Sequence, residues 1–165
     1  MPIYSKGANW IPADSFTTRL KKNDYANLIG SARDANMNML RVWGGGIYEP
    51  DVFYELCDEM GIMVWQDFMF ACSMYPAHPE FLESVKIEAE YQVNRLKTHP
   101  SIVLWCGNNE IAIAWHGWGW KEELPYSVWE DYAKIFHGIL PKTCKDLDPE
   151  RLYWPSSPGY TTKIP

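Results

Sequence analysis

Glu110, which follows a pair of asparagines, is the residue of this sequence best placed to do chemistry. Asn108, Asn109 and Glu110 come one glycine after the apolar run 101–106. A lone glutamate in such a place is most often an exposed loop carboxylate. The amide pair changes that expectation, because an amide beside a catalytic glutamate can bind a sugar 2-hydroxyl, a contact that strengthens in an oxocarbenium-like transition state. The pattern favours a general acid/base at Glu110.

Polar and aromatic residues also stand at the ends of the other apolar runs. They are Asn9 and Trp10, Arg41 and Trp43, Asp67, and Ser156–Ser157. The bodies of these runs are apolar, so the polar residues are concentrated where each run stops. Functional groups of (β/α)8 barrels gather at the carboxyl ends of the strands, and the distribution is typical of that arrangement.

The elements that would position these residues alternate along the chain. Strands are expected over residues 7–11, 39–43, 62–68 and 101–106, with a fifth beginning at 152–154. Helices are expected over residues 22–35, 51–60, 79–98 and 129–147, from apolar residues at helical spacing. Such alternation predicts an α/β fold with a parallel sheet.

Two architectures fit this alternation. Five strands and four helices in 165 residues match the pitch of a (β/α)8 barrel, which needs about 250 residues in full. A doubly wound sheet would want a glycine-rich phosphate loop after a strand. Gly44–Gly46 lacks the required spacing and opens no immediate helix. We therefore expect residues 1–165 to form a partial TIM barrel, about the first four to five β/α units.

Composition excludes some classes of partner. The net charge is −6 and no Lys/Arg cluster occurs, which argues against nucleic acid. No apolar stretch approaches the length of a membrane span. Nine Trp and ten Tyr fit a carbohydrate ligand and an aromatic core about equally well, because aromatic rings also dominate cores.

Cysteine and histidine spacing gives no metal signature. The four Cys show no C-x-x-C, and the four His show no H-x-x-x-H pair, so neither a metal nor another cofactor is expected. Cys57, Cys106 and Cys144 sit in apolar or helical runs and are predicted to be buried free thiols. Glu49 and Asp51 are interpreted as charges at a helix N-terminus.

Four runs carry a family resemblance. Lys6–Asp14, Arg41–Glu49, Trp65–Ala71 and Trp105–Glu110 resemble, in this order, β-mannosidases of glycoside hydrolase family 2. Asn-Glu at the end of a fourth strand is shared across the wider clan. The Arg-Val-Trp-Gly-Gly-Gly and Trp-Gln-Asp-Phe-Met runs are more specific to the β-mannosidase branch.

The resemblance implies roles for four residues around the reacting sugar. Glu110 would be the acid/base of a retaining hydrolase, and Asn109 would hold the 2-hydroxyl, which is axial in mannose. Trp43 would line the −1 subsite. Arg41 would lie under the two catalytic carboxylates and help hold their charges apart. From the residues alone, a structural ion pair is as good an interpretation of Arg41.

The resemblance implies three further substrate-binding residues. Asp67 would support the subsite, and Asp14 lies where the family's early loop meets the pocket. Trp118 resembles a loop Trp that closes over the sugar. Trp115, Trp118 and Trp120 could instead form a folded-back loop cluster.

The resemblance also implies parts that this chain does not contain. A retaining glycosidase needs two carboxylates about 5–5.5 Å apart, and the family's nucleophile is a Glu at the end of the seventh strand. The family's β-sandwich domains are absent as well. We therefore expect a fragment of an enzyme that releases terminal β-D-mannose from a β-mannoside oligosaccharide or glycoconjugate, and expect the fragment alone to be inactive.

Two other functions remain open. A family 2 β-glucuronidase or β-galactosidase would share the acid/base, although the Trp43 and Trp65 runs argue against it. A non-catalytic sugar-binding piece of a barrel would keep Trp43 and Trp118 and bind mannose without turnover. The sequence leaves the compartment and the oligomeric state undetermined.

Overall fold

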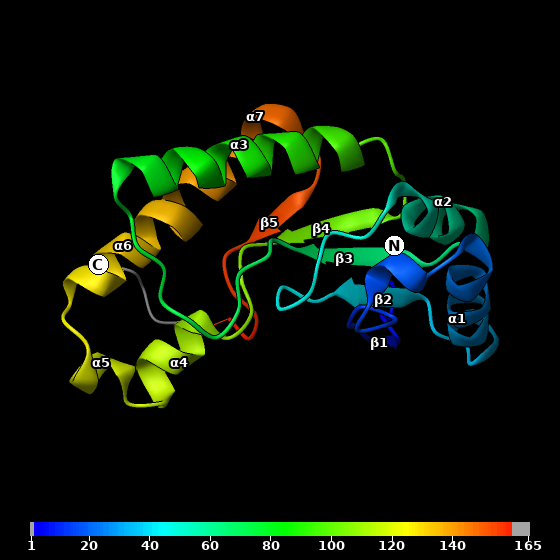
Figure 1. Ribbon diagram of the computed structural model, residues 1–165, viewed down its shortest axis with the longest axis horizontal. Coiled ribbons are helices and arrows are strands. Elements are labelled where there is room, and N and C mark those ends of the chain that lie inside the picture. Colours follow the sequence, from blue (N-terminus) through cyan, green and yellow to red (C-terminus); the bar gives the residue numbers. More distant parts are fainter. Residues whose placement is uncertain (1, 160–165) are drawn as a thin grey trace.

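A parallel sheet forms the centre of the computed structural model, which describes residues 2–159. Its strands are β1 (Gly7–Trp10), β2 (Met39–Val42), β3 (Met63–Asp67), β4 (Ile102–Cys106) and β5 (Leu152–Trp154). Each strand pairs in parallel with the next one along the chain, so the spatial order is β1-β2-β3-β4-β5 (Figure 1). The predicted α/β fold with a parallel sheet is confirmed.

The predicted helices are present with small changes at their ends. They are α1 (Lys22–Asp34), α2 (Asp51–Met60), α3 (Pro79–Leu96), and a continuous run of α6 (Ser127–Ala133), a π-helical turn (Lys134–Ile139) and α7 (Leu140–Leu147). Two short helices, α4 (Ile111–Gly117) and α5 (Trp120–Glu123), and a 3-10 turn at Thr17–Arg19 were not predicted. Gly117 and Gly119 interrupt the apolar spacing there, so no helical period is visible.

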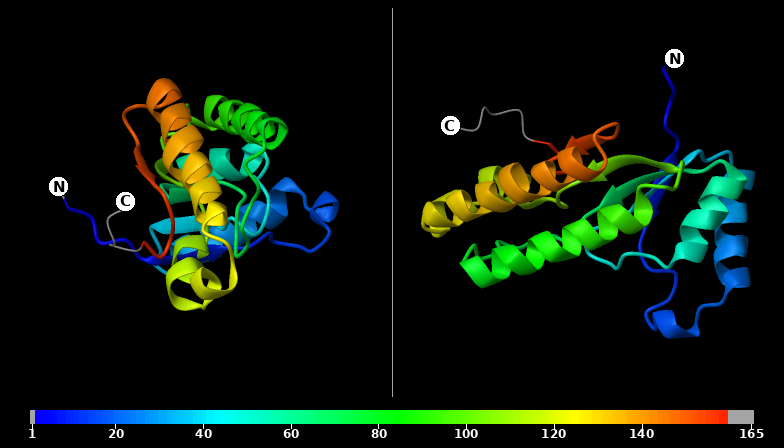
Figure 2. Two further views of the ribbon diagram at one scale, coloured as in Figure 1. Left: turned by 90° about the vertical axis from the view of Figure 1, so that its left-hand side faces the viewer. Right: turned by 90° about the horizontal axis from the view of Figure 1, so that it is seen from above.

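The strand order places the connecting helices on one side of the sheet. Crossovers between parallel strands are right-handed in nearly all proteins. Because every crossover here moves one strand in the same direction, the helices fall on one face, where α1 packs beside α2 and α3 beside α7 (Figure 2). A doubly wound sheet would instead reverse its order midway.

The register shows how the two faces differ. The paired row Asn9, Arg41, Trp65, Leu104 and Leu152 shares one face, and the next row, Trp10, Val42, Gln66, Trp105 and Tyr153, shares the other. Four of the second row are buried, whereas every residue of the first row keeps some exposure. The helices therefore cover the face of the second row, and the face of the first row is uncovered.

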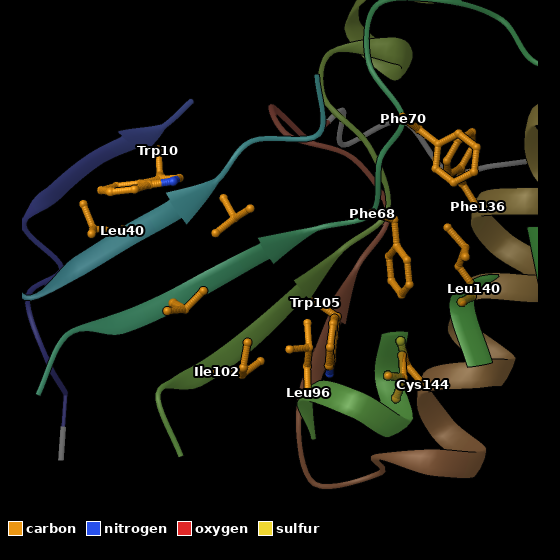
Figure 3. Close-up of a cluster of buried hydrophobic side chains, with 14 of the residues drawn as sticks. Trp10, Leu40, Phe68, Phe70, Leu96, Ile102, Trp105, Phe136, Leu140 and Cys144 are labelled. Atoms are coloured by element: carbon orange, nitrogen blue, oxygen red, sulfur yellow. The ribbon is translucent and has the colours of Figure 1, made fainter. Parts of the chain in front are cut away.

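The core lies between the sheet and the helices (Figure 3). Trp105 is fully buried, and its Nε1 donates to Asp148 at 2.8 Å. Trp10 packs on Phe53 with ring centroids 4.8 Å apart. These two Trp are core residues, and at these positions the aromatic content reflects packing rather than ligand binding.

Glu49 lies at the N-terminus of α2, where its side chain is enclosed by the core. It is buried, at 1 % exposure, and its Oε1 accepts from Trp10 Nε1 at 2.9 Å. Burial raises the pKa of Glu49, while the hydrogen bonds from Trp10 and Tyr25 lower it. Glu49 directly precedes Pro50, the N-cap of α2, so it lies at the helix N-terminus as predicted, whereas its burial was not predicted. Asp51 does lie in the first turn of α2, paired with Arg95.

The cysteines are as predicted where a prediction was made. Cys57, Cys106 and Cys144 are buried free thiols, and Cys72 is exposed.

Within residues 2–159, no helix is long and apolar enough to cross a membrane. In the same range no group of three His, Cys, Asp or Glu side chains is arranged to hold a metal ion.

Candidate active site

Glu110 lies just beyond the carboxyl end of β4, as the residue that precedes α4. Its backbone is left-handed, with φ 65° and ψ 2°. Its N–H donates to Ser157 O at 2.9 Å, and its carbonyl oxygen accepts from Ala114 N at 2.9 Å. The residue is therefore held from both sides, by the segment after β5 and by the first turn of α4.

Asn108 fixes the turn that carries Glu110. Its side chain is buried and donates to Pro155 O at 2.9 Å. Its Oδ1 accepts from Ile111 N at 3.1 Å and from Ser156 Oγ at 2.7 Å. All of these contacts are internal, so Asn108 builds the frame and Asn109 is the amide that faces the site.

Arg41 and Asp67 form a paired charge beside this turn. Arg41 Nη2 lies 2.8 Å from Asp67 Oδ2, with Nε 3.2 Å from both carboxylate oxygens. Asp67 is buried and also accepts from Gly44 N and Trp65 Nε1, each at 2.9 Å. Burial raises the pKa of Asp67, and these donors act in the opposite direction. The ion-pair interpretation of Arg41 is confirmed.

The same arginine begins a line of contacts that ends at Glu110. Its Nη2 donates to Asn109 Oδ1 at 3.0 Å. Asn109 Nδ2 donates to Cys72 Sγ at 3.4 Å, and Cys72 Sγ donates to Glu110 Oε2 at 3.4 Å. Four of the residues singled out from the sequence, Asp67, Arg41, Asn109 and Glu110, are thus brought together.

Cys72 is the member of this line that sequence reasoning missed. It follows the Trp65–Ala71 run, which continues beyond β3 and forms an isolated bridge between Ala71 and Asn109. A polar or thiol side chain just after a strand-like run was the available signal. That signal did not indicate that the Cys72 thiol would hydrogen-bond to the Glu110 carboxylate.

The other three candidate residues do not join the line. Asp14 pairs with Arg19 at 2.6 Å and accepts from Phe16 N at 2.7 Å, and these contacts lower its pKa. Trp118 is 47 % exposed and meets Trp120 edge-on, with ring centroids 5.8 Å apart.

Trp43 lies at the same end of the sheet, after β2. Its N–H donates to Trp10 O at 3.1 Å. A Cβ on Gly45 would come within 1.9 Å of the Trp43 ring, so the ring lies directly over the glycine backbone. A Cβ on Gly44 would come within 2.7 Å of the carbonyl oxygens of Phe68 and Phe70, so glycine is needed at position 44 for close packing of the backbone.

A hollow opens on the uncovered face of the sheet. It has a volume of about 450 Å³, and Arg41, Trp65 and Ser157 line it together with residues of β1 and β2. The Arg41 guanidinium lies 5.0 Å from the Trp65 ring centroid. Arg41 therefore connects the hollow to the end of the sheet where Glu110 lies.

Comparisons with known proteins show that this chain is similar to β-mannosidases. No protein-family model matches the chain. It is 50 % identical to a β-mannosidase of Capra hircus over 161 residues, which is 96 % of this chain and 18 % of that protein. It is 45 % identical to β-mannosidase B of Thermothelomyces thermophilus, over 94 % of this chain and 19 % of that protein. The chain is a homologue of one segment of the β-mannosidases.

Solved structures agree with this homology. A β-D-mannosidase from Dictyoglomus thermophilum superposes with a TM-score of 0.89 at 55 % identity, over 96 % of this chain and 19 % of that one. A Bacteroides uniformis β-glucuronidase has a TM-score of 0.75 at 19 % identity, which shows a shared fold alone. The chain spans about a fifth of the length of these β-mannosidase relatives.

Proposed function

We propose that residues 1–165 are the N-terminal half of the catalytic (β/α)8 barrel of a retaining β-mannosidase. The enzyme would release terminal non-reducing β-D-mannose from oligosaccharides or glycoconjugates. The observation that carries the proposal is the 55 % identity to a β-D-mannosidase structure over 96 % of the chain. The hydrogen-bonded line that ends at Glu110 supplies a chemical reason for it.

The sheet supports the barrel part of the proposal. Five parallel strands in sequential order, with helices on one face, are what the first part of a (β/α)8 barrel contains. In a barrel the opposite face turns inward, where its side chains pack against the inward side chains of the remaining strands. The uncovered face, with Arg41 and Trp65 along its hollow, fits that interior. The β-sandwich domains and the second half of the barrel would lie outside this chain.

Glu110 would serve as acid in the first step and as base in the second. It would protonate the glycosidic oxygen as the leaving group departs, and then take a proton from the water that releases mannose. The residue is partly exposed, as contact with a substrate requires. The nucleophile, a second carboxylate about 5–5.5 Å away, would come from the part of the enzyme outside this chain.

Asn109 would bind the 2-hydroxyl. An amide nitrogen has two N–H donors, and the Nδ2 of Asn109 uses one on Cys72. Its Oδ1 is held by Arg41, which sets the direction of the amide. The second N–H is then available to a sugar hydroxyl, and the buried Asp67 would support this contact through Arg41.

The remaining residues would shape the pocket. Trp43 would wall the −1 subsite at the end of β2. Trp118, which is 47 % exposed at the end of α4, would stack on the sugar. Asp14 would contribute from the loop after β1, with Arg19 fixing its carboxylate.

Replacing Glu110 by Gln in the full-length enzyme tests the function. We expect kcat/KM for 4-methylumbelliferyl β-mannoside to fall by about 10²–10⁴, the usual contribution of a positioned general acid. Glu122, an exposed carboxylate twelve residues later, gives the matched control, and Glu122→Gln should keep full activity. Unchanged hydrolysis in Glu110→Gln would show that the acid/base assignment is wrong.

The same assays separate the alternatives. A panel of aryl β-mannoside, β-glucuronide and β-galactoside identifies the sugar that is cleaved. Mannose binding without hydrolysis of any of the three would favour a non-catalytic sugar-binding barrel. The identity of 50 % and 55 % to β-mannosidases favours the mannoside.

A further inference from the structure

Cys72 is held in place by its backbone, next to the proposed acid/base. Its N–H donates to Asn109 O at 3.0 Å, and Asn109 N donates to Phe70 O at 2.9 Å. The segment after β3 therefore runs alongside the segment after β4. This pairing brings the side chains of Cys72 and Glu110 together although 38 residues separate them.

Both residues adopt a backbone that is costly for a side chain. Among residues 2–159, three non-glycine residues have a positive φ: Asn36, Cys72 at 48° and Glu110 at 65°. Asparagine adopts this region comparatively easily, whereas cysteine and glutamate rarely do. Backbone strain of this kind persists where the surrounding structure enforces it, and it is concentrated at functional sites.

The contacts of the thiol have a defined direction. A carboxylate can only accept, so the Cys72 S–H donates to Glu110 Oε2. An amide nitrogen can only donate, so Asn109 Nδ2 donates to the sulfur. Burial, followed by the hydrogen bond to Glu110, raises the pKa of the Cys72 thiol. The thiol therefore stays protonated at neutral pH and keeps the proton that it donates.

We propose that Cys72 is a positioning residue that holds the Glu110 carboxylate in line with the glycosidic oxygen. The proposal rests on the proposed function, because it assigns Cys72 to the same reaction. The thiol would couple Glu110 to Asn109, and through Arg41 to the buried Asp67. Loss of the thiol would leave Glu110 chemically intact but free to rotate away from the leaving group.

This role predicts a dependence on the leaving group. Protonation of the departing oxygen is essential when that oxygen is a poor leaving group, and is dispensable for a dinitrophenolate. A residue that only orients the acid should therefore affect the first kind of substrate alone. A residue needed for the fold or for sugar binding would affect both kinds equally.

The first test compares Cys72→Ala with wild type in the full-length enzyme. We expect kcat/KM for mannobiose, whose leaving group is a sugar alkoxide, to fall about tenfold or more, and that for 2,4-dinitrophenyl β-mannoside to change less than about twofold. Cys72→Ser should recover part of the loss, because a hydroxyl also donates and accepts. Ser73→Ala, at the next exposed position, should behave as wild type.

Three results would overturn the proposal. The first is an equal loss of kcat/KM on all substrates in Cys72→Ala, and the second is no loss of kcat/KM on any of them. The third is a Cys72→Ser variant that recovers none of the lost kcat/KM. Glu110→Gln measured alongside separates this failure from failure of the function itself. If Glu110→Gln keeps full activity, Glu110 is not the acid/base, and the proposed function is wrong whatever Cys72 does. If Glu110→Gln loses activity and Cys72→Ala does not, only the role of Cys72 is wrong.

The second test reports on the contact without any hydrolysis. Iodoacetamide alkylation of Cys72 is followed by mass spectrometry of the peptide that contains it, in wild type, Glu110→Gln and Glu122→Gln. Removing the Glu110 charge should speed alkylation at pH 7.5 by about threefold or more, because the thiol then ionises more readily. An unchanged rate in Glu110→Gln would show that the thiol and the carboxylate do not meet.

Discussion

At the scale of single residues, Arg41 both neutralises the buried Asp67 and orients the Asn109 amide. The edge of its guanidinium that carries Nε and Nη2 pairs with Asp67, which is fully buried, and Nη2 also donates to Asn109 Oδ1. Guanidinium suits this place because it is planar and donates in several fixed directions. An ammonium group at this position would keep the charge and lose the fixed geometry.

Replacing Arg41 separates the effect of its charge from the effect of its fixed hydrogen-bond geometry. We expect Arg41→Met to destabilise the fold by about 3–5 kcal/mol, since it leaves the Asp67 carboxylate buried without its partner. Arg41→Lys should cost less stability but lower kcat/KM on β-mannosides about tenfold, because Asn109 loses its fixed donor. Urea unfolding and steady-state kinetics on the full-length enzyme measure the two effects. Arg33→Lys, in an exposed pair with Asp34, is the control, and a fully active Arg41→Lys would contradict the argument.

The sequence indicated which residues belong to the candidate site, but not the hydrogen bonds that connect them. Glu110, Asn109, Arg41 and Asp67 were identified because chemically able residues end apolar runs. The role of Cys72 could not be predicted, because it depends on the pairing of Ala71 with Asn109 and on a positive φ. The family resemblance alone assigned the 2-hydroxyl to Asn109, and the internal role of Asn108 was not predicted, since only the fold turns one amide inward and the other toward the site.

At the scale of the elements, the two ends of the sheet have different tasks. The carboxyl ends carry the line from Asp67 to Glu110. At the amino ends, Arg151 binds the segment between α3 and β4, donating to the carbonyl oxygens of Lys97 and His99 and to Ile102 O. It also pairs with the buried Asp148. In barrels this end serves stability rather than catalysis.

Arg151→Ala tests the assignment of this end to stability. Three carbonyl oxygens and Asp148 would lose a donor, so we expect a loss of about 3 kcal/mol or more in the free energy of unfolding. Because the site lies at the other end of the sheet, kcat/KM at 25 °C should change less than about twofold. Lys145→Ala, at an exposed position of α7, provides a matched control. A large loss of kcat/KM without a loss of stability would contradict the separation of the two ends.

The elements themselves were predicted closely where the pattern was simple. β2 to β4 follow apolar runs, and α2 ends at Gly61, which has the left-handed φ of 70° typical of a helix C-terminus. The segment 111–123 was not predicted as helical, since its helices have only seven and four residues. The burial of Glu49 was not predicted, because it depends on a tryptophan 39 residues away in the sequence.

At the scale of the whole molecule, the sheet has one covered face and one uncovered face. Apolar side chains reach that uncovered face and its edge: Leu152 is 62 % exposed and Trp154 is 46 % exposed. β1 and β5 each have one neighbour in the described sheet, so their outer edges present unpaired backbone groups. Unpaired parallel edges and exposed apolar area favour association with other chains.

Residues 1–165 produced alone should therefore associate or unfold at micromolar concentration. We expect sedimentation velocity to show species larger than a monomer, and urea unfolding to be broad and dependent on protein concentration. Leu152→Lys should reduce the association, because it places a charge on the exposed edge strand, while Lys145→Ala should leave it unchanged. A concentration-independent, sharp two-state transition of a monomer would contradict this expectation. That result would mean that the uncovered face is stable in water, and would remove one of the reasons for placing it inside a closed barrel.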